Sequence, residues 1–177
     1  MRDHLDRYYT PDAVADACVG VLDLRGVRSV LEPSVGHGAW VRAIRSRLPE
    51  AHIRSVDLDP AAKHDSADAI EHGDFRDCDC WADLIVGNPP FSEALAHVEH
   101  ALTLAPAVGF LLRLAFLEGA GRAAFWRAHP AYEVHVLTQR PSFTGGGTDS
   151  AAYAYFVWLR GFRGPTLQRH LDWRGVR

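Results

Sequence analysis

The apolar positions of the chain gather in short runs that read as strands. Such runs occupy residues 28–32, 52–59, 82–87 and 108–116, and a further short strand is expected to end near Gly73. The run "VGFLLRLAF" at 108–116 is continuous, which is typical of a strand buried on both faces. Two more runs, "YEVHVLTQ" (132–139) and "AAYAYFVWL" (151–159), are predicted to close the sheet as a pair.

Segments with helical spacing lie between these strands. The first, residues 10–22, has Thr10 as a candidate N-cap and Pro11 at the first helical position. Further helices are predicted at 38–48, from Pro60, after Ser92 and near 118–128. This alternation predicts one α/β domain over 1–177, with a mostly parallel seven-stranded sheet and helices on both faces. Ligands of such sheets bind beyond the carboxyl ends of the strands, so residues that follow strands are the candidate site.

Composition adds few constraints. No apolar run approaches the roughly 20 residues of a membrane helix, and the polar start "MRDHLDRYYTPD" argues against a secretory signal. We therefore expect a cytoplasmic protein with no membrane partner. Cys18, Cys78 and Cys80 lack paired spacing, and "CDC" near His72 has no second ligand pair, which favours reduced thiols over a metal site.

Charge is uneven along the chain. Residues 1–100 hold 10 basic and 18 acidic side chains, and residues 101–177 hold 9 basic and 4 acidic ones, so the two parts carry −8 and +5. Arginine provides 18 of the 19 basic residues. The positive second part favours a polyanionic partner, although arginine-rich composition explains it equally well.

Three successive strand ends carry the features of an adenosine pocket. "EPSVGHGAW" offers Gly36 and Gly38 for a tight turn near a ligand and a helix N-terminus. Asp57, in "VDLD", can accept hydrogen bonds from ribose hydroxyls. In "GDF", Asp74 can accept one from a nucleobase amine while Phe75 packs beside the ring. Taken singly, each could be an ordinary turn or capping residue. The turn lacks a third glycine, because Val41 stands at that position, and this weakens a dinucleotide reading.

The fourth strand end is the corner Asn88-Pro89-Pro90-Phe91. An exocyclic amine on a nucleobase is a poor nucleophile, and acceptors for its two N–H groups make its lone pair available. The Asn88 side chain and the Pro89 main chain supply such acceptors, which the prolines hold in fixed directions. Phe91 offers a face for an extruded base. A proline-rich turn before a capped helix is the alternative.

These segments resemble the S-adenosylmethionine-dependent N6-adenine DNA methyltransferases, most of all the small phage- and prophage-type members. The resemblance lies in "YYTP" (8–11), "EPSVGHGAW" (32–40), "VDLDP" (56–60), "GDF" (73–75), "NPPF" (88–91) and "RPSFTGGGTDS" (140–150). It implies a Rossmann-like class I methyltransferase fold with S-adenosylmethionine as cofactor. It also implies Tyr8, Thr10, Pro33, Gly36 and Gly38 at the methionine end, Asp57 at the ribose, and Asp74 with Phe75 at the adenine. Asn88 and Pro89, held in direction by Pro90, would bind the target amine. Phe91 would lie against the ring of the target base. His37 and Trp40 depart from the usual family residues.

The loop at 140–150 is expected at the edge of the active site. We assign Arg140 to a phosphate and Phe143 to the substrate, and Gly145, Gly146 and Gly147 to closure of the loop over a nucleic-acid strand. A flexible hairpin tip is the alternative. The basic tail 161–177 either follows a nucleic-acid backbone or is a disordered end. No separate target-recognition domain fits after Phe91, so specificity would come from loops, from a partner or homodimer, or be relaxed.

The expected activity is methylation of the adenine N6 amine in DNA, on a flipped-out base or a single strand, as in restriction–modification or phage enzymes. RNA adenine and protein glutamine are alternative acceptors. A catalytically silent nucleotide- or DNA-binding module and an NAD-dependent oxidoreductase are alternatives of other classes. Carbon-5 cytosine methylation is disfavoured, because it needs a Pro-Cys nucleophile that the chain lacks.

Overall fold

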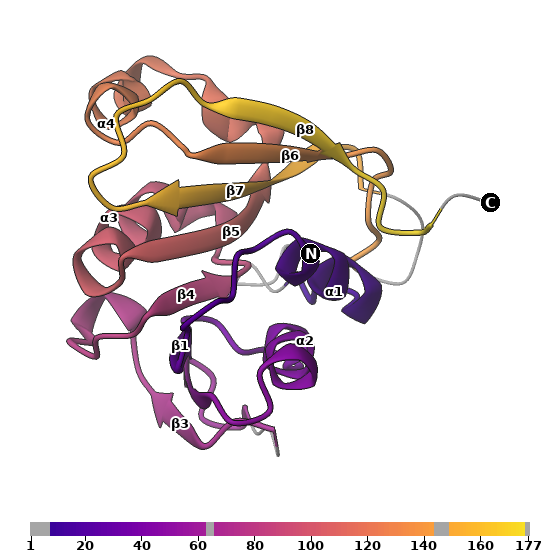
Figure 1. Ribbon diagram of the computed structural model, residues 1–177, viewed down its shortest axis with the longest axis vertical. Coiled ribbons are helices and arrows are strands. Elements are labelled where there is room, and N and C mark those ends of the chain that lie inside the picture. Colours follow the sequence, from indigo (N-terminus) through magenta and orange to yellow (C-terminus); the bar gives the residue numbers. More distant parts are fainter. Residues whose placement is uncertain (1–7, 63–65, 144–148, 176–177) are drawn as a thin grey trace.

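A mixed sheet of eight strands forms the centre of the protein, in the order β3-β2-β1-β4-β5-β7-β6-β8. The computed structural model describes residues 8–62, 66–143 and 149–175. Figure 1 shows α1 and α2 on one side of the sheet and α3 and α4 on the other. No helix within these described ranges is long and apolar enough to cross a membrane.

The strands and helices match most of the predicted ranges. The strands are β1 (Ser29–Glu32), β2 (His52–Asp57), β3 (Ala69–His72), β4 (Leu84–Gly87), β5 (Ala107–Arg113), β6 (Glu133–Leu137), β7 (Tyr153–Leu159) and β8 (Leu167–Leu171). The α-helices are α1 (Asp12–Gly20), α2 (Ala39–Arg47), α3 (Ala94–Leu104) and α4 (Ala123–Ala128). Short 3-10 helices are η1 (Phe75–Asp77), η2 (Phe91–Glu93), η3 (Leu114–Leu117) and η4 (Ala120–Arg122).

The first five strands are parallel, and their carboxyl ends therefore share one edge of the sheet. Strand order reverses between β1 and β4, because β2 and β3 extend the sheet from one side of β1, whereas β4 and β5 extend it from the other. A crevice at such a reversal is the usual ligand site of open α/β sheets. Strand β7 is antiparallel to both β5 and β6, which confirms the predicted closing pair.

Two apolar clusters cover the two faces of the sheet. Neighbouring residues of β1 point to opposite faces, so Val30 packs with α1 and α2, and Leu31 packs with α3 and α4. The first cluster includes Val14, Cys18, Trp40 and Ile44. The second includes Val98, Leu102 and Phe125. Continuous burial of the central strands explains why their sequences are apolar runs without alternation.

Three expectations about secondary structure were wrong. The sheet has eight strands instead of seven, because the tail contains β8, which pairs in parallel with β6. Residues 60–62 form only a turn after Asp59, whose side chain accepts a hydrogen bond from the Ala61 amide, so the helix expected from Pro60 does not begin there. Helix α1 begins at Asp12 with Pro11 as its N-cap, and the Thr10 hydroxyl instead accepts a hydrogen bond from Trp40 Nε1.

The tail is also anchored after β8. Trp173 Nε1 donates a hydrogen bond to the Gln139 carbonyl at 2.7 Å, and Arg174 lies over the Trp173 ring. The described part of the tail, up to residue 175, is therefore packed against the sheet instead of forming a disordered end.

Gly109 provides a test of the packing at the centre of β5. A Cβ atom added at this position would lie 2.1 Å from Tyr155 Oη, and Tyr155 is fully buried. We expect Gly109→Ala to reduce the free energy of unfolding by about 1–3 kcal/mol or more, because overpacking forces shifts of buried groups. Gly121→Ala is the matched control, since nothing lies within 4 Å of a Cβ added there. Equal urea midpoints for the two variants would contradict the prediction.

Candidate functional site

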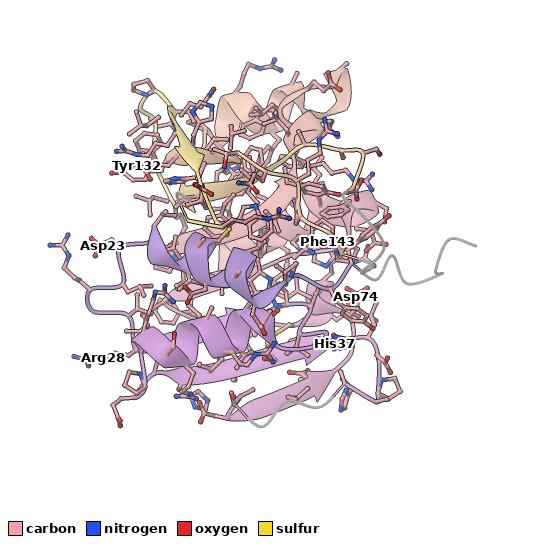
Figure 2. All side chains as sticks on the ribbon, turned by 90° about the vertical axis from the view of Figure 1, so that its right-hand side faces the viewer. Asp23, Arg28, His37, Asp74, Tyr132 and Phe143 are labelled. Carbon is pink, nitrogen blue, oxygen red and sulfur yellow. The ribbon has the colours of Figure 1, made fainter. Side chains whose placement is uncertain are left out.

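A cavity of about 700 Å³ lies at the carboxyl ends of β1 to β4. Figure 2 shows His37, Asp74 and Phe143 along one edge of the molecule, whereas Asp23 and Arg28, which precede β1, lie at the opposite edge. The cavity size falls within the range of about 300–1,000 Å³ that is typical of small-molecule sites. The N-terminal residues Tyr8 and Tyr9 contribute to its wall.

Most of the residues proposed for the cofactor line this cavity, namely Tyr8, Pro33, Gly36, Asp57, Asp74 and Phe75. Two of the residues proposed for the target amine, Asn88 and Pro90, line it as well. Thr10, Gly38, Pro89 and Phe91 are not among the lining residues, although each adjoins one that is. The fold thus brings together residues that are up to 82 positions apart in the sequence, from Tyr8 to Pro90.

The glycine turn and Asp57 form one hydrogen-bonded unit. Gly36 and Gly38 have φ of 47° and 72°, a region that favours glycine, and Gly38 is the N-cap of α2. A Cβ at Gly36 would lie 3.1 Å from the Tyr9 ring, which stacks on His37. Asp57 Oδ2 accepts a hydrogen bond from the Gly36 amide at 2.9 Å, and Asp57 Oδ1 accepts one from the Asp59 amide at 2.8 Å. A carboxylate has about four lone-pair sites, so Asp57 retains capacity for a ligand hydroxyl.

Asp74 has a partner that the sequence did not indicate. Its carboxylate accepts hydrogen bonds from the Arg76 backbone amide and from Arg76 Nε, both at 2.9 Å. These contacts hold the pKa of Asp74 at about 2, with the Arg76 side chain as the largest cause. Phe75 is buried and packs against His97 and His100 with ring centroids 5.5 Å and 4.9 Å away. An adenine amine at Asp74 would share the carboxylate with Arg76.

Asn88 directly follows β4, and its side-chain orientation is set by the N-terminal segment. Asn88 Nδ2 donates to the Tyr8 carbonyl at 2.9 Å. Among the residues that the structure describes, Asn88 Oδ1 is buried and has no hydrogen-bond partner. Buried side-chain oxygens are nearly always paired, so a free carbonyl oxygen at a cavity wall indicates a place for a donor.

An aromatic cluster lies next to Asn88. We use "aromatic cluster" for Tyr8, Phe91, Phe143 and Tyr153. The Phe91 ring lies 5.2 Å from Tyr8, 6.3 Å from Phe143 and 5.4 Å from Tyr153, measured between centroids. Phe91 remains partly exposed, whereas Phe143 and Tyr153 are buried. The cluster joins the corner after β4 to the loop after β6 and to the start of β7.

The other residues assigned to the substrate are only partly described. Arg140 is exposed in the loop after β6, and Phe143 belongs to the aromatic cluster. Gly145, Gly146 and Gly147 lie outside the described residues, so their proposed role in loop closure is a prediction that the structure does not address. The loop is closed at its base, where the Asp149 amide donates to the Pro141 carbonyl at 3.2 Å.

Glu32 is a candidate site residue that we did not identify from the sequence. It is the last residue of β1, only 1% exposed, and neither carboxylate oxygen has a hydrogen-bond partner among the described residues. Burial raises the pKa of Glu32 well above its ordinary value, and the charge of Asp57 adds to this effect. The acidic residue at the end of an apolar strand was the feature of the sequence that could have identified Glu32 as a candidate site residue.

We expect Glu32→Gln to stabilise the ligand-free protein. Because the folded state holds a proton that the unfolded chain loses above about pH 4.3, stability should fall as pH rises from there toward the folded pKa. The glutamine variant lacks this titration, so it should be more stable than wild type at neutral pH. Thermal unfolding from pH 5 to 8 measures this difference in stability, and Glu50→Gln, at an exposed position, is the control. Identical pH profiles for wild type and Glu32→Gln would contradict the expectation.

One group of metal-ligating side chains lies outside the cavity wall. One ligand atom each of Glu71, Cys78 and Cys80 lies within 4.8 Å of the others. Burial raises the pKa of Cys78 to about 11, which favours the neutral thiol. Structural zinc sites have four protein ligands, and the described residues supply three here, so we assign no metal to this group.

Several solved structures superpose on this chain. No protein-family model matches the chain. A class I S-adenosylmethionine-dependent methyltransferase described as putative, from Listeria monocytogenes, superposes with a TM-score of 0.71 at 13% identity, over 96% of this chain and 68% of that one. A type I restriction–modification methyltransferase subunit from Streptococcus thermophilus gives 0.71 at 14% identity, over 92% of this chain and 47% of that one.

The matches also include an RNA methyltransferase, again described as putative, from Pyrococcus horikoshii, with a TM-score of 0.68 at 13% identity and 89% coverage of both chains. The chain spans less than half the length of the restriction–modification subunit that it matches. Identities this low establish the architecture alone. The chain has the Rossmann-like fold of the class I S-adenosylmethionine-dependent methyltransferases.

Proposed function

We propose that the protein is an S-adenosylmethionine-dependent methyltransferase that acts on the exocyclic N6 amine of adenine in DNA. The observation that carries the proposal is the buried Oδ1 of Asn88, which has no hydrogen-bond partner among the described residues and lies in a corner stiffened by Pro89 and Pro90. An acceptor in this position suits a substrate N–H and not a carbonyl or phosphate oxygen.

The cavity residues fit the methyl donor. Asp57 offers its remaining lone pairs to ribose hydroxyls, and the glycine turn lets main chain approach the ligand closely. Glu32 directly precedes the cavity residue Pro33 and has no hydrogen-bond partner among the described residues, and in its ionised form it would suit the ammonium group of a methionine moiety. Asp74 and Phe75 line the cavity on the side of β3, where an adenine ring would lie.

The residues of the chain contribute positioning and hydrogen bonding to the reaction. When bound, S-adenosylmethionine supplies an electrophilic methyl group, whose carbon–sulfur bond breaks as the carbon–nitrogen bond forms. Asn88 Oδ1 and the Pro89 carbonyl accept hydrogen bonds from the amine and direct its lone pair. An amide oxygen cannot keep the proton that the nitrogen loses, so the proton passes to water. Fixed acceptors need no reorganisation during the reaction, which is how they lower its barrier.

Two observations favour a nucleic acid, and DNA is the nucleic acid that we propose. The aromatic cluster and Arg140 offer stacking and phosphate contacts at the same edge as Asn88. The segment after residue 100 carries a net charge of +5, which suits a polyanion. Sequence specificity would come from loops, a partner subunit or a second copy of the chain. RNA adenine and protein glutamine are the competing acceptors, because their amines would meet the same corner.

The decisive experiment is incubation of the purified protein with a labelled methyl donor and one of four acceptors: plasmid DNA, transfer RNA, ribosomal RNA or a glutamine-containing peptide mixture. We expect N6-methyladenine in the DNA, detected by nucleoside analysis and then mapped to positions. Methylation of RNA or peptide alone would overturn the DNA assignment. Binding of the donor without transfer to any acceptor would instead identify a silent binding module.

A further inference from the structure

Arg113 ends β5 beside the corner that carries Asn88. Strands β4 and β5 are parallel, with Gly87 opposite Phe110, so the residues after Gly87 run alongside the last residues of β5. The Arg113 guanidinium carbon lies 4.8 Å from the Phe91 ring centroid and 5.8 Å from that of Tyr8. Arg113 is 22 positions after Phe91 in the sequence, and only the order of the strands brings them together.

The guanidinium is held from one side. Arg113 is opposite Tyr153 in the pairing of β5 and β7, and the two side chains lie close enough to interact. Tyr153 Oη in turn donates to Asp149 at 2.7 Å. Contact with the Phe91 ring and the position opposite Tyr153 restrict the planar group, so its donors have preferred directions.

One of these donors has no partner. Arg113 Nε is buried and makes no hydrogen bond within the described part of the chain. A buried donor that is left unused is destabilising, so this arrangement is expected where a ligand completes it. Within the same described residues, Asn88 Oδ1 is a second buried atom without a hydrogen-bond partner. Tyr8 contacts both residues, through its carbonyl at Asn88 and its ring at Arg113.

These two atoms are complementary to the edge of an aminopurine. Adenine presents an amine donor at N6 with an acceptor ring nitrogen on either side, N1 and N7. Asn88 Oδ1 is an acceptor and Arg113 Nε is a donor, and the aromatic cluster provides flat surfaces beside both. A simple alkyl amine lacks the second acceptor and would leave Arg113 unsatisfied.

We propose that Arg113 is a specificity-determining residue that donates a hydrogen bond from Nε to the ring nitrogen beside the target amine. The proposal rests on the proposed function and deepens it, since it names the chemical edge by which the acceptor is read. Arg113 thereby selects and positions the base, while Asn88 accepts from the amine that is methylated. Its loss should raise KM for the nucleic acid and lower kcat/KM, and leave donor binding unchanged.

The test combines protein variants with base analogues. Oligonucleotides would carry adenine, 1-deazaadenine or 7-deazaadenine at the position that the wild-type enzyme methylates. We expect one analogue to reduce wild-type kcat/KM about 10- to 100-fold, the effect of one hydrogen bond to a charged group. Arg113→Met should show that loss with adenine itself and no further loss with the same analogue. Arg113→Lys should remain impaired, because an ammonium does not reproduce the planar donor.

The controls separate this role from a structural one. Arg160→Met changes another arginine that bonds to a main-chain carbonyl, that of Thr103, and is expected to behave as wild type. Donor affinity, measured by calorimetry, should be equal in Arg113→Met and wild type. The assignment is overturned if neither analogue slows the wild-type enzyme, or if the analogue penalty persists undiminished in Arg113→Met or Arg113→Lys. If the wild type methylates no adenine at all, the proposed function and this assignment both fail, and that result is distinct from the other two.

Discussion

Asn88→Ala is expected to lower the rate of methyl transfer by about 100- to 1,000-fold or more, the usual effect of removing one preorganised hydrogen-bonding group. The alanine variant lacks the only side-chain acceptor of the corner, so the amine nitrogen is neither oriented nor activated. Affinity for S-adenosylmethionine should stay nearly unchanged, because Asp57, Glu32 and the glycine turn are intact. Single-turnover kinetics at saturating donor, together with calorimetric donor binding, measures both quantities.

A second effect of the substitution has to be separated from the first. Asn88 Nδ2 also holds the Tyr8 carbonyl, and Tyr8 lines the donor cavity. Asn88→Asp is the matched control, because it keeps an acceptor oxygen and loses the donor to Tyr8. We expect Asn88→Asp to bind the methyl donor more weakly than Asn88→Ala does and still to retain more transfer activity at saturation. If both variants fail only in donor binding, the corner serves the cofactor, and its role at the amine is wrong.

The features that the sequence predicted are those that depend on local pattern. The strands around Leu31, Ile85 and Phe110 are buried runs. Gly36, Asp57, Asp74 and Asn88 lie at or after the ends of β1 to β4, which a parallel sheet must bring to one edge. Strand β8 escaped prediction because it lies at the edge of the sheet, with four of its five residues exposed. It has no apolar periodicity to reveal it.

Other features depend on which elements become neighbours. The sequence cannot show that Arg76 would occupy the carboxylate of Asp74, since both residues read as exposed turn positions. The contact between Arg113 and Phe91 requires β5 to lie beside β4, with β7 antiparallel on its other side. The sequence shows Glu32 as an acid at a strand end. It does not show that the carboxylate lacks a hydrogen-bond partner among the described residues, because that follows from burial in the packed structure.

Asp57→Ala is expected to produce the reverse of the Asn88 phenotype. Donor affinity should fall about 10- to 100-fold, because charge-assisted hydrogen bonds contribute about 1.5–3 kcal/mol, while transfer at saturating donor stays close to wild type. The structure adds a reason that the sequence did not provide. Asp57 also accepts the Gly36 and Asp59 amides, so its loss loosens the turn that approaches the ligand as well as removing the ribose acceptor.

Asp57→Ala removes two hydrogen bonds to backbone amides as well as the proposed ribose acceptor, and Asp83 provides a control for the first of these effects. Its carboxylate accepts the Arg28 and Ser29 amides, both at 2.9 Å, and it lies before β4, at the end of the strands opposite the cavity. Asp83→Ala should therefore cost stability comparable to Asp57→Ala and leave donor affinity unchanged. Asp57→Asn, which keeps one carbonyl oxygen, should have intermediate affinity. If Asp57→Ala and Asp83→Ala bind the methyl donor with equal affinity, Asp57 only stabilises the glycine turn, and its assignment to the ribose is wrong.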